Sequence, residues 1–298
     1  MITLQNVSKV FNKTTAVDEL SFDIPKRSVF GLLGPNGAGK TTVIRMIMNI
    51  IQPDSGKISI EGKPVEQKNY RRIGYLPEER GLYRKMKLKN TIIYFGTLKG
   101  LSKPVAARQT NYFLEQFNLT NYAERKIEEL SKGNQQKVQF IIAVIHQPDL
   151  LILDEPFAGL DPVNQLGLKE FLKDFQASGK TIILSTHQME QVEKLCDMIC
   201  LINNGKKVLY GDLKDIKNNF SSKKFIIRFE GDKNQIADFI LPDWELSGDR
   251  LSGTLNSPSS INNILNKVIA RVTVTHVDIV EPSLEQVFID QVKGRVDS

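Results

Sequence analysis

Cysteine is scarce in this 298-residue chain, which has only Cys196 and Cys200. Two cysteines exclude the disulfide framework that holds many small secreted domains together. A metal site would need further ligands, and no histidine or third cysteine joins the pair. We therefore interpret both residues as buried thiols.

Long hydrophobic runs are also missing. The longest apolar stretches, 140–145 and 150–153, are far shorter than the ~18 residues that a membrane-spanning helix needs. The first six residues contain no basic segment followed by an apolar core, so we expect no signal peptide. These absences favour a cytoplasmic location.

The positive charge is unevenly distributed. The chain has a net charge of +6, yet residues 221–298 hold nine Lys and Arg against eleven Asp and Glu. The excess of basic residues therefore lies in residues 1–220. Such an excess suits nucleic acid or an anionic membrane surface, and equally a solvated surface on which some lysines bind phosphate.

What the sequence does contain is a phosphate-binding motif. A short apolar run, 29–33, precedes a stretch of the form G-x-x-x-x-G-K-T, and a helical pattern follows it. Glycines let the backbone N–H groups wrap around phosphates, and the helix N-terminus adds a positive dipole end. We expect Lys40 to reach the β- and γ-phosphates and Thr41 to ligate Mg²⁺. The loop as a whole predicts binding of a nucleoside triphosphate; its residues are Gly34, Pro35, Asn36, Gly37, Ala38, Gly39, Lys40, Thr41 and Thr42.

Two further apolar strands end in reactive side chains. Residues 150–153 are followed directly by Asp154 and Glu155. In a phosphate-loop protein we expect the first carboxylate to hold Mg²⁺ and the second to orient or deprotonate the attacking water. The strand 181–186 ends at His187, which is a candidate sensor of the γ-phosphate, although a lone histidine is usually structural.

The pattern changes near residue 221. Strands are predicted at 224–230 and 271–277, with helices at 232–240 and 258–269, the second capped by Ser257 with Pro258 in its first turn. Two short strands meet at Gly248–Asp249. This β-α-β-β-α-β order predicts a small ferredoxin-like unit, followed by a helix at 283–292.

These motifs together resemble those of ATP-binding cassette (ABC) proteins over about residues 1–215. Leu130–Lys137 is similar to the signature sequence of that family, and residues 158–161 resemble its D-loop. His187 falls at the family's switch histidine, and Glu78 where the family usually has the Q-loop glutamine. The Pro77–Tyr83 stretch and the small C-terminal domain look most like ATP-binding subunits of bacterial exporters of the sodium- and drug-efflux type.

The resemblance implies an α/β fold. We expect a P-loop ABC cassette at 1–220, with a RecA-like core and a helical subdomain at about 80–147, and an accessory α+β domain at 221–298. Two cassettes dimerise head to tail in this family, so that ATP lies between the phosphate loop of one and the signature of the other. Homodimer and heterodimer both remain open.

The resemblance also implies roles for individual residues. Phe11 becomes a base-stacking aromatic, although a lone aromatic is more often part of a core. Ser131 and Gly133 would bind the γ-phosphate across the dimer, and Asp161 of the D-loop would also bind the nucleotide. Glu78 would be a further oxygen ligand of Mg²⁺ beside Thr41 and Asp154, directly or through water. The remaining departures from the signature pattern are Lys132 and Asn134, which replace the usual glycine and glutamine.

The function that follows is the ATPase subunit of an ABC exporter, with ATP and Mg²⁺ as cofactors. Separate transmembrane permease subunits would hold it on the inner face of the membrane, and no nucleic acid is expected as a partner. One alternative is a soluble ABC ATPase acting on nucleic acid or ribosomes, motivated by the basic charge. The other, an unrelated phosphate-loop kinase or GTPase, leaves the signature unexplained. The C-terminal domain could regulate the cycle, add dimer contacts, bind a ligand or serve only in packing.

Overall fold

The structure is a computed structural model that describes residues 1–65, 71–78, 81–219, 223–242, 244–255, 260–280 and 283–293. The chain divides into two compact units, Met1–Leu213 and Lys214–Ser298. Each unit is described by itself.

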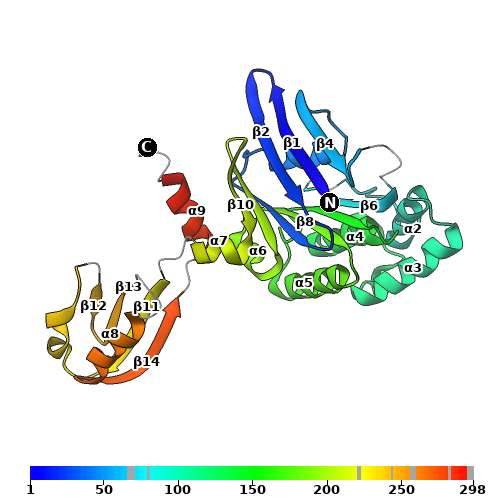
Figure 1. Cartoon of the computed structure of the whole chain (residues 1–298). Coiled ribbons are helices and arrows are strands. Elements are labelled where there is room, and N and C mark those ends of the chain that lie inside the picture. Colours follow the sequence, from blue (N-terminus) through cyan, green and yellow to red (C-terminus); the bar gives the residue numbers. More distant parts are fainter. Residues whose placement is uncertain are drawn as a thin grey trace. The chain divides into compact units, whose positions relative to one another are not determined.

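A six-stranded sheet forms the centre of the first unit (Figure 1). In spatial order the strands are β10 (Lys206–Asp212), β9 (Met198–Asn203), β3 (Val29–Leu33), β8 (Thr181–Thr186), β7 (Leu150–Asp154) and β6 (Ile73–Leu76). Neighbouring strands run parallel to each other except β10 and β9, which are antiparallel.

The central strands are buried along their length because the sheet is covered on both faces. Every residue of β3 and β7 is buried, as expected for apolar runs in a parallel sheet. Parallel strands end at one edge of the sheet. The residues that follow β3, β7 and β8 are therefore brought close to one another, although they are far apart in the sequence.

A second sheet is fully antiparallel and has the order β2–β1–β4–β5. Buried side chains of β1, β2 and β3 pack with the first helix, α1 (Lys40–Ile47), in one hydrophobic core. The strands of this sheet are β1 (Ile2–Phe11), β2 (Thr14–Ile24), β4 (Ser55–Ile60) and β5 (Lys63–Pro64).

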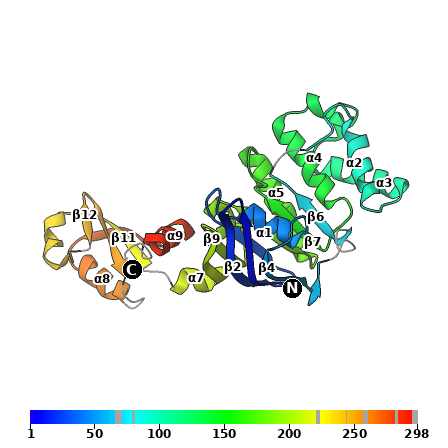
Figure 2. The same cartoon turned by 90° about the horizontal axis from the view of Figure 1, so that it is seen from above.

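Three helices of the first unit lie close to one another. The helices α2, α3 and α4 gather at one end of the unit (Figures 1 and 2), where α2 contacts both α3 and α4. No helix among the described residues is both long and apolar enough to cross a membrane. The helices are α1 (Lys40–Ile47), α2 (Leu88–Leu98), α3 (Lys103–Gln116), α4 (Lys132–Val144), α5 (Pro162–Ala177) and α6 (Met189–Leu195), with 3₁₀ turns η2 (Thr120–Tyr122) and η3 (Ile127–Glu129).

The second unit contains a four-stranded antiparallel sheet in the order β12–β13–β11–β14. This order and these directions are those of a ferredoxin-like unit. One face packs against α8 in a separate hydrophobic core. The elements are α7 (Leu213–Asn219), which starts at the end of the first unit, β11 (Lys223–Glu230), β12 (Glu245–Ser247), β13 (Arg250–Leu255), α8 (Ser260–Ile269), β14 (Thr273–Val280) and α9 (Leu284–Lys293).

The predicted helix at 232–240 was wrong. That segment forms two 3₁₀ turns, η4 (Lys233–Gln235) and η5 (Ala237–Phe239). Ile236 separates them with a φ of −112° and is completely buried in the core of the unit. This φ is far from the helical value of about −63°, so a regular helix does not continue through Ile236. The proposed Ser257 cap and Pro258 lie outside the described residues.

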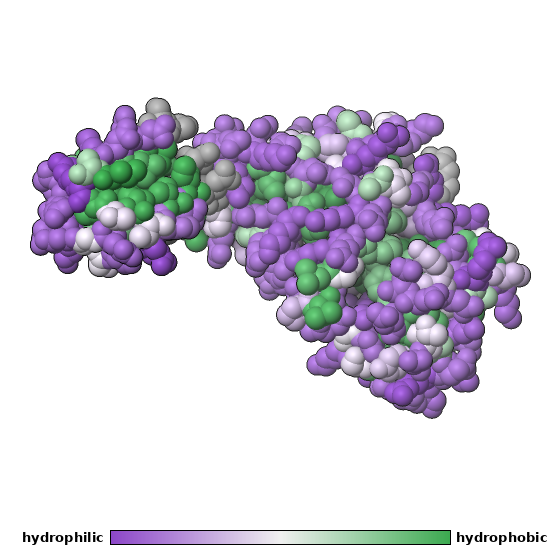
Figure 3. All heavy atoms as spheres, turned by 90° about the horizontal axis from the view of Figure 1, so that it is seen from below, coloured by the Kyte–Doolittle hydropathy of each residue, from purple (hydrophilic) through white to green (hydrophobic). Residues whose placement is uncertain are grey.

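One region of the second unit presents apolar residues to solvent. Figure 3 shows hydrophobic side chains gathered on this unit. The exposed large apolar residues of β14 are Val277, Ile279 and Val280.

Candidate functional site

The phosphate loop connects β3 to α1 and has a backbone that only glycine adopts easily. Gly39 has a φ of 105°, and a Cβ there would lie 2.3 Å from the carbonyl oxygen of Ala16. A Cβ on Gly34 would lie 2.1 Å from the carbonyl oxygen of Ile202. These close approaches explain both glycines in physical terms.

The loop lines a cavity of about 350 Å³. The carboxylates of Asp154 and Glu155, which follow a strand, and of Glu78, which falls at the Q-loop position, share this cavity with the loop. The other lining residues are Ala16, Asn36, Gly37, Ala38, Gly39, Lys40, Thr41 and Thr42. The cavity is thus lined both by the Lys40 ammonium group and by three carboxylates.

Lys40 is buried at the start of α1 and folds back onto the loop. Its Nζ donates hydrogen bonds to the carbonyl oxygens of Gly34 at 2.8 Å and Pro35 at 3.1 Å. Burial lowers the pKa of Lys40, and the nearby carboxylates, Glu155 first, oppose this effect. The ammonium group is therefore held in the cavity by acceptors that a phosphate can replace.

Asp154 is buried at the end of β7, with 2% of its surface exposed. It accepts hydrogen bonds from Thr41 Oγ1 at 3.0 Å and from Ser185 Oγ at 2.7 Å. Burial raises the pKa of Asp154, and these two hydrogen bonds oppose the rise. A hydroxyl and a carboxylate oxygen in contact are the donor types that Mg²⁺ takes in phosphate-loop proteins, so the residues fit that ion.

Glu155 is held by the end of β8. Its carboxylate accepts hydrogen bonds from Thr186 Oγ1 at 2.9 Å and from the backbone N–H of His187 at 3.0 Å. The His187 Nδ1 lies 2.7 Å from the same carboxylate. Glu155 also has a φ of 49°, which is strained for a residue with a side chain. A strained, buried carboxylate beside the phosphate loop is positioned for proton transfer.

Ser185 and Thr186 were not identified from the sequence. Both hydroxyls are buried at the carboxyl end of an otherwise apolar strand, and each holds one of the two carboxylates. Buried polar residues at a strand end are uncommon without a partner. The two hydroxyl residues at the end of this apolar strand were therefore the signal in the sequence that could have identified Ser185 and Thr186.

Several predicted residues do not line this cavity, among them Gly34, Pro35 and His187, which border it in sequence, and the three residues of the signature and D-loop. Ser131 caps α4 by accepting a hydrogen bond from the backbone of Asn134 at 3.2 Å, and Asp161 caps α5 in the same way with Asn164 at 3.0 Å. A Cβ on Gly133 would meet no atom within 4 Å. None of these three residues lines the phosphate cavity.

Phe11 does not line that cavity either. It ends β1 with 46% of its surface exposed, and the Nζ of Lys9 lies 5.6 Å from its ring centre. The alternative that Phe11 belongs to the core does not fit this exposure. Its base-stacking role stays a prediction.

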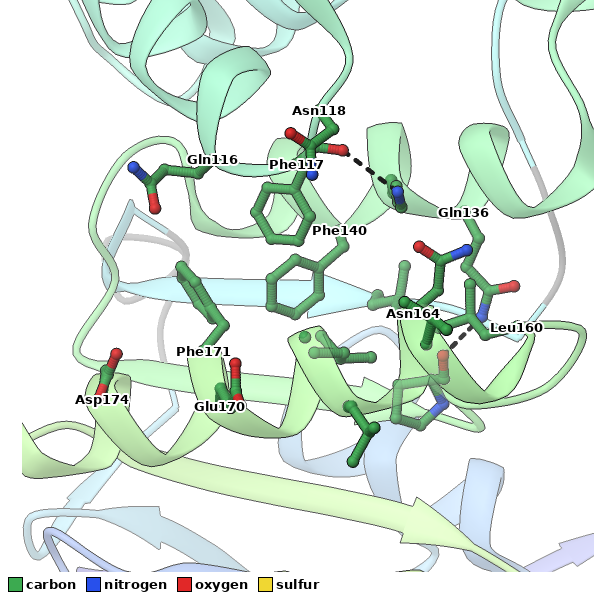
Figure 4. A pocket seen from close by; sticks show the side chains of 17 residues that line it. Gln116, Phe117, Asn118, Gln136, Phe140, Leu160, Asn164, Glu170, Phe171 and Asp174 are labelled. Carbon is green, nitrogen blue, oxygen red and sulfur yellow. Dashed lines mark hydrogen bonds between the residues drawn. The ribbon is translucent and has the colours of Figure 1, made fainter.

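The signature helix α4 is fixed to the segment that follows Glu155. Gln136 Nε2 donates to the carbonyl oxygen of Pro156 at 2.7 Å (Figure 4). Next to this bond, a pocket of about 460 Å³ lies between α3, α4 and α5, where the rings of Phe117, Phe140 and Phe171 face one another. The helix α4 is therefore hydrogen-bonded to the residue that directly follows Glu155 in the sequence.

The fold and the site define a class of protein: a phosphate-loop nucleoside triphosphatase. Comparisons with known proteins narrow this class. The sequence profile of the ABC transporter family matches residues 17–158, and the profile of the C-terminal domain of DrrA1-3-like ATP-binding proteins matches residues 211–292.

Similar proteins agree with these profiles. The chain is 45% identical over 294 residues to the uncharacterized ABC transporter ATP-binding protein YhaQ of Bacillus subtilis, covering 98% of each chain. It is 34% identical over 267 residues to Nod factor export ATP-binding protein I of Burkholderia thailandensis, covering 88% of each. A solved ATP-binding subunit of an ABC transporter superposes with a TM-score of 0.68 at 31% identity, over 74% of this chain and 93% of that one.

The chain belongs to the family of ABC transporter ATP-binding subunits. It is an ATPase that powers a transporter, and its nucleotide is ATP. The predicted P-loop fold and the predicted family are thereby confirmed.

Proposed function

We propose that two copies of this chain bind two ATP molecules head to tail and drive an exporter. The relative named for Nod factor export supports export. In this proposal separate permease subunits span the membrane, and the chain sits on their cytoplasmic side. The alternative of action on nucleic acid or ribosomes is not favoured, since the relatives are transporter subunits.

The observation that carries the proposal is the separation of the two halves of the site. The phosphate loop and both carboxylates share one cavity, whereas Ser131 and Gly133 do not line it. A second copy would supply the missing contacts to the γ-phosphate. Closure would then depend on ATP, because the triphosphate binds both halves at once.

Within each cavity we assign roles to the side chains. Lys40 exchanges its carbonyl partners for β- and γ-phosphate oxygens. Thr41 and Asp154 would hold Mg²⁺, with Glu78 as a further oxygen ligand directly or through water; the ion would neutralise phosphate charge. The described residues bring no group of three acidic, histidine or cysteine side chains together as a metal site. Phosphate oxygens would therefore complete the ion's coordination.

Glu155 is the proposed general base. Its carboxylate accepts the proton of the attacking water, and Thr186 fixes its orientation. The ring of His187 is 48% exposed while it contacts Glu155, so it can turn from the carboxylate toward the γ-phosphate. Glu155 and His187 each follow a strand of the central sheet, and the sheet holds these strand ends rigidly.

The test replaces one oxygen of that base. Glu155→Gln keeps the shape and should keep ATP binding, but it removes the proton acceptor. We expect turnover to fall about 10²–10⁴-fold and a dimer to accumulate with Mg²⁺ and ATP, measured by phosphate release and by sedimentation. Glu115→Gln, the same change on an exposed position of α3, is the matched control. Normal turnover in the Glu155 variant, or a monomer at every ATP concentration, would contradict the proposal.

A further inference from the structure

The strand β14 lies at the edge of the sheet in the second unit. Its partner on one side is β11, and no strand among the described residues pairs with its other side. An edge strand presents unpaired N–H and C=O groups that can pair with another chain. β14 is eight residues long, so its open edge is long enough for a specific contact.

The side chains along this edge are unusually apolar. Val277 is 38% exposed, Ile279 44% and Val280 38%. Val277 and Ile279 stand opposite Ile227 and Phe225 of β11, both completely buried. They therefore continue the hydrophobic face of the sheet beyond the part that is covered. Such a strip beside an open backbone is typical of a surface that another strand covers.

Two charged or ionisable residues alternate with the apolar ones. His276 and Asp278 are both exposed on the opposite face of the sheet, where they pair with Arg228 and Ile226 of β11. Edge charges normally oppose pairing with arbitrary strands. Here the two residues are two positions apart, so His276 of one strand can face Asp278 of a second, antiparallel copy of the same strand.

We propose that β14 pairs with β14 of a second copy, antiparallel and across a two-fold axis at Val277. In this register His276 of each copy stands opposite Asp278 of the other, and Val277 stands opposite itself. An axis at Asp278 would instead place the Asp278 carboxylates of the two copies opposite each other, which is destabilising. An axis at His276 would place Asp278 opposite Val274. Only the axis at Val277 pairs both polar residues with a suitable partner.

The regular part of the contact spans residues 276–278, because the register of β14 shifts between Val274 and His276. A ladder of this length is weak alone. This part of the inference rests on the proposed function: when ATP holds two cassettes together, the second contact becomes intramolecular and its effective concentration is high. The C-terminal unit would then add a dimer contact to each cycle.

The test uses disulfide formation between full-length chains. Val277→Cys places a thiol opposite its own copy, whereas His276→Cys and Asp278→Cys each face a different residue. The native Cys196 and Cys200 are buried, and the unsubstituted chain gives the background. We expect Val277→Cys to crosslink ~10-fold faster than either other variant, since directly opposite Cβ atoms are closest. Mixing the His276→Cys and Asp278→Cys chains should restore fast crosslinking.

The measurement is made with Glu155→Gln in each chain, with and without Mg²⁺ and ATP, and sedimentation follows cassette dimerisation separately. Crosslinking of Val277→Cys no faster than that of the two single controls, in a preparation that is dimeric, would overturn the β14 contact alone. Absence of both dimer and crosslink would count against this contact and the proposed function together. A partner strand from any other protein would also leave the Val277→Cys chains uncrosslinked and overturn the inference.

Discussion

Among single residues, Asp154 illustrates a conflict between function and stability. Its carboxylate is buried, and burial raises its pKa above the ordinary range. An acid whose pKa is higher in the folded state binds its proton more tightly there, so the folded state loses stability as the pH rises above the unfolded pKa. At neutral pH the ionised group therefore costs folding free energy, which Thr41 and Ser185 reduce by hydrogen bonding.

Asp154→Asn should for this reason stabilise the protein without nucleotide while removing Mg²⁺-dependent ATPase activity. The amide retains hydrogen bonds to the two hydroxyls but carries no charge. Each ~1 kcal/mol gained raises the melting temperature by about 2–4 °C in a domain of this size. Thermal melting at pH 7.5 and phosphate release with titrated Mg²⁺ are the measurements. A lower melting temperature, or unchanged Mg²⁺ dependence, would refute this account of Asp154.

For the secondary-structure elements, the contact between α4 and β6 contains a histidine that the sequence analysis did not single out. His146 follows α4, and its Nε2 lies 3.2 Å from the carbonyl oxygen of Ile73. Its Nδ1 is buried and has no hydrogen-bond partner among the described residues. Burial, followed by the charge of Lys99, lowers the pKa of His146 from 6.5 to about 4.

This shift predicts acid sensitivity. The unfolded chain binds a proton near pH 6.5 and the folded chain only near pH 4, so stability is lost as the pH falls between these values. We expect a loss of about 2 kcal/mol after allowing for solvent screening. His146→Gln keeps a donor toward Ile73 but does not titrate. Urea unfolding at pH 6.5 and pH 4 should therefore show a smaller decrease for the variant, and equal decreases would exclude His146 as the cause.

Elements built from local patterns were predictable, and those decided by tertiary contacts were not. The runs before Gly34 and Asp154 identified buried strands because parallel strands are apolar on both faces. The turn between β9 and β10 is also explained by its local sequence, because Asn-Gly suits a tight hairpin and both Asn204 and Gly205 have positive φ. The segment at 232–240 followed a helical period, yet it forms two 3₁₀ turns that are separated by the non-helical φ of Ile236.

The candidate site shows the same division. The phosphate loop and the Asp154–Glu155 pair were visible as sequence motifs, because each motif is contiguous and its chemistry is local. Ser185 and Thr186 act only because β8 lies beside β7. That adjacency comes from the order of strands in the sheet, which single-sequence periodicity does not provide.

In the whole molecule, the proposed dimer contains two sites, each built from a phosphate loop and the signature of the other copy. Gly133 offers a sharp way to disable only the signature. Its φ is not in the left-handed region, and a Cβ there would meet no atom within 4 Å, so the chain alone tolerates a side chain. Across the dimer, Gly133→Asp would place a carboxylate against the γ-phosphate and repel it.

Lys40→Ala disables the other half-site by removing the ammonium group from the phosphate loop. Each variant alone should be nearly inactive, because both sites of its dimer contain one defect. A mixed dimer contains one site with both defects and one with none. Random mixing makes about half of the dimers mixed, so an equimolar mixture should regain about a quarter of the normal ATPase rate. Phosphate release measured against the mixing ratio tests this. If activity instead followed the sum of the separate variants at every ratio, each cavity would be working within a single chain, and the shared-site arrangement would be wrong.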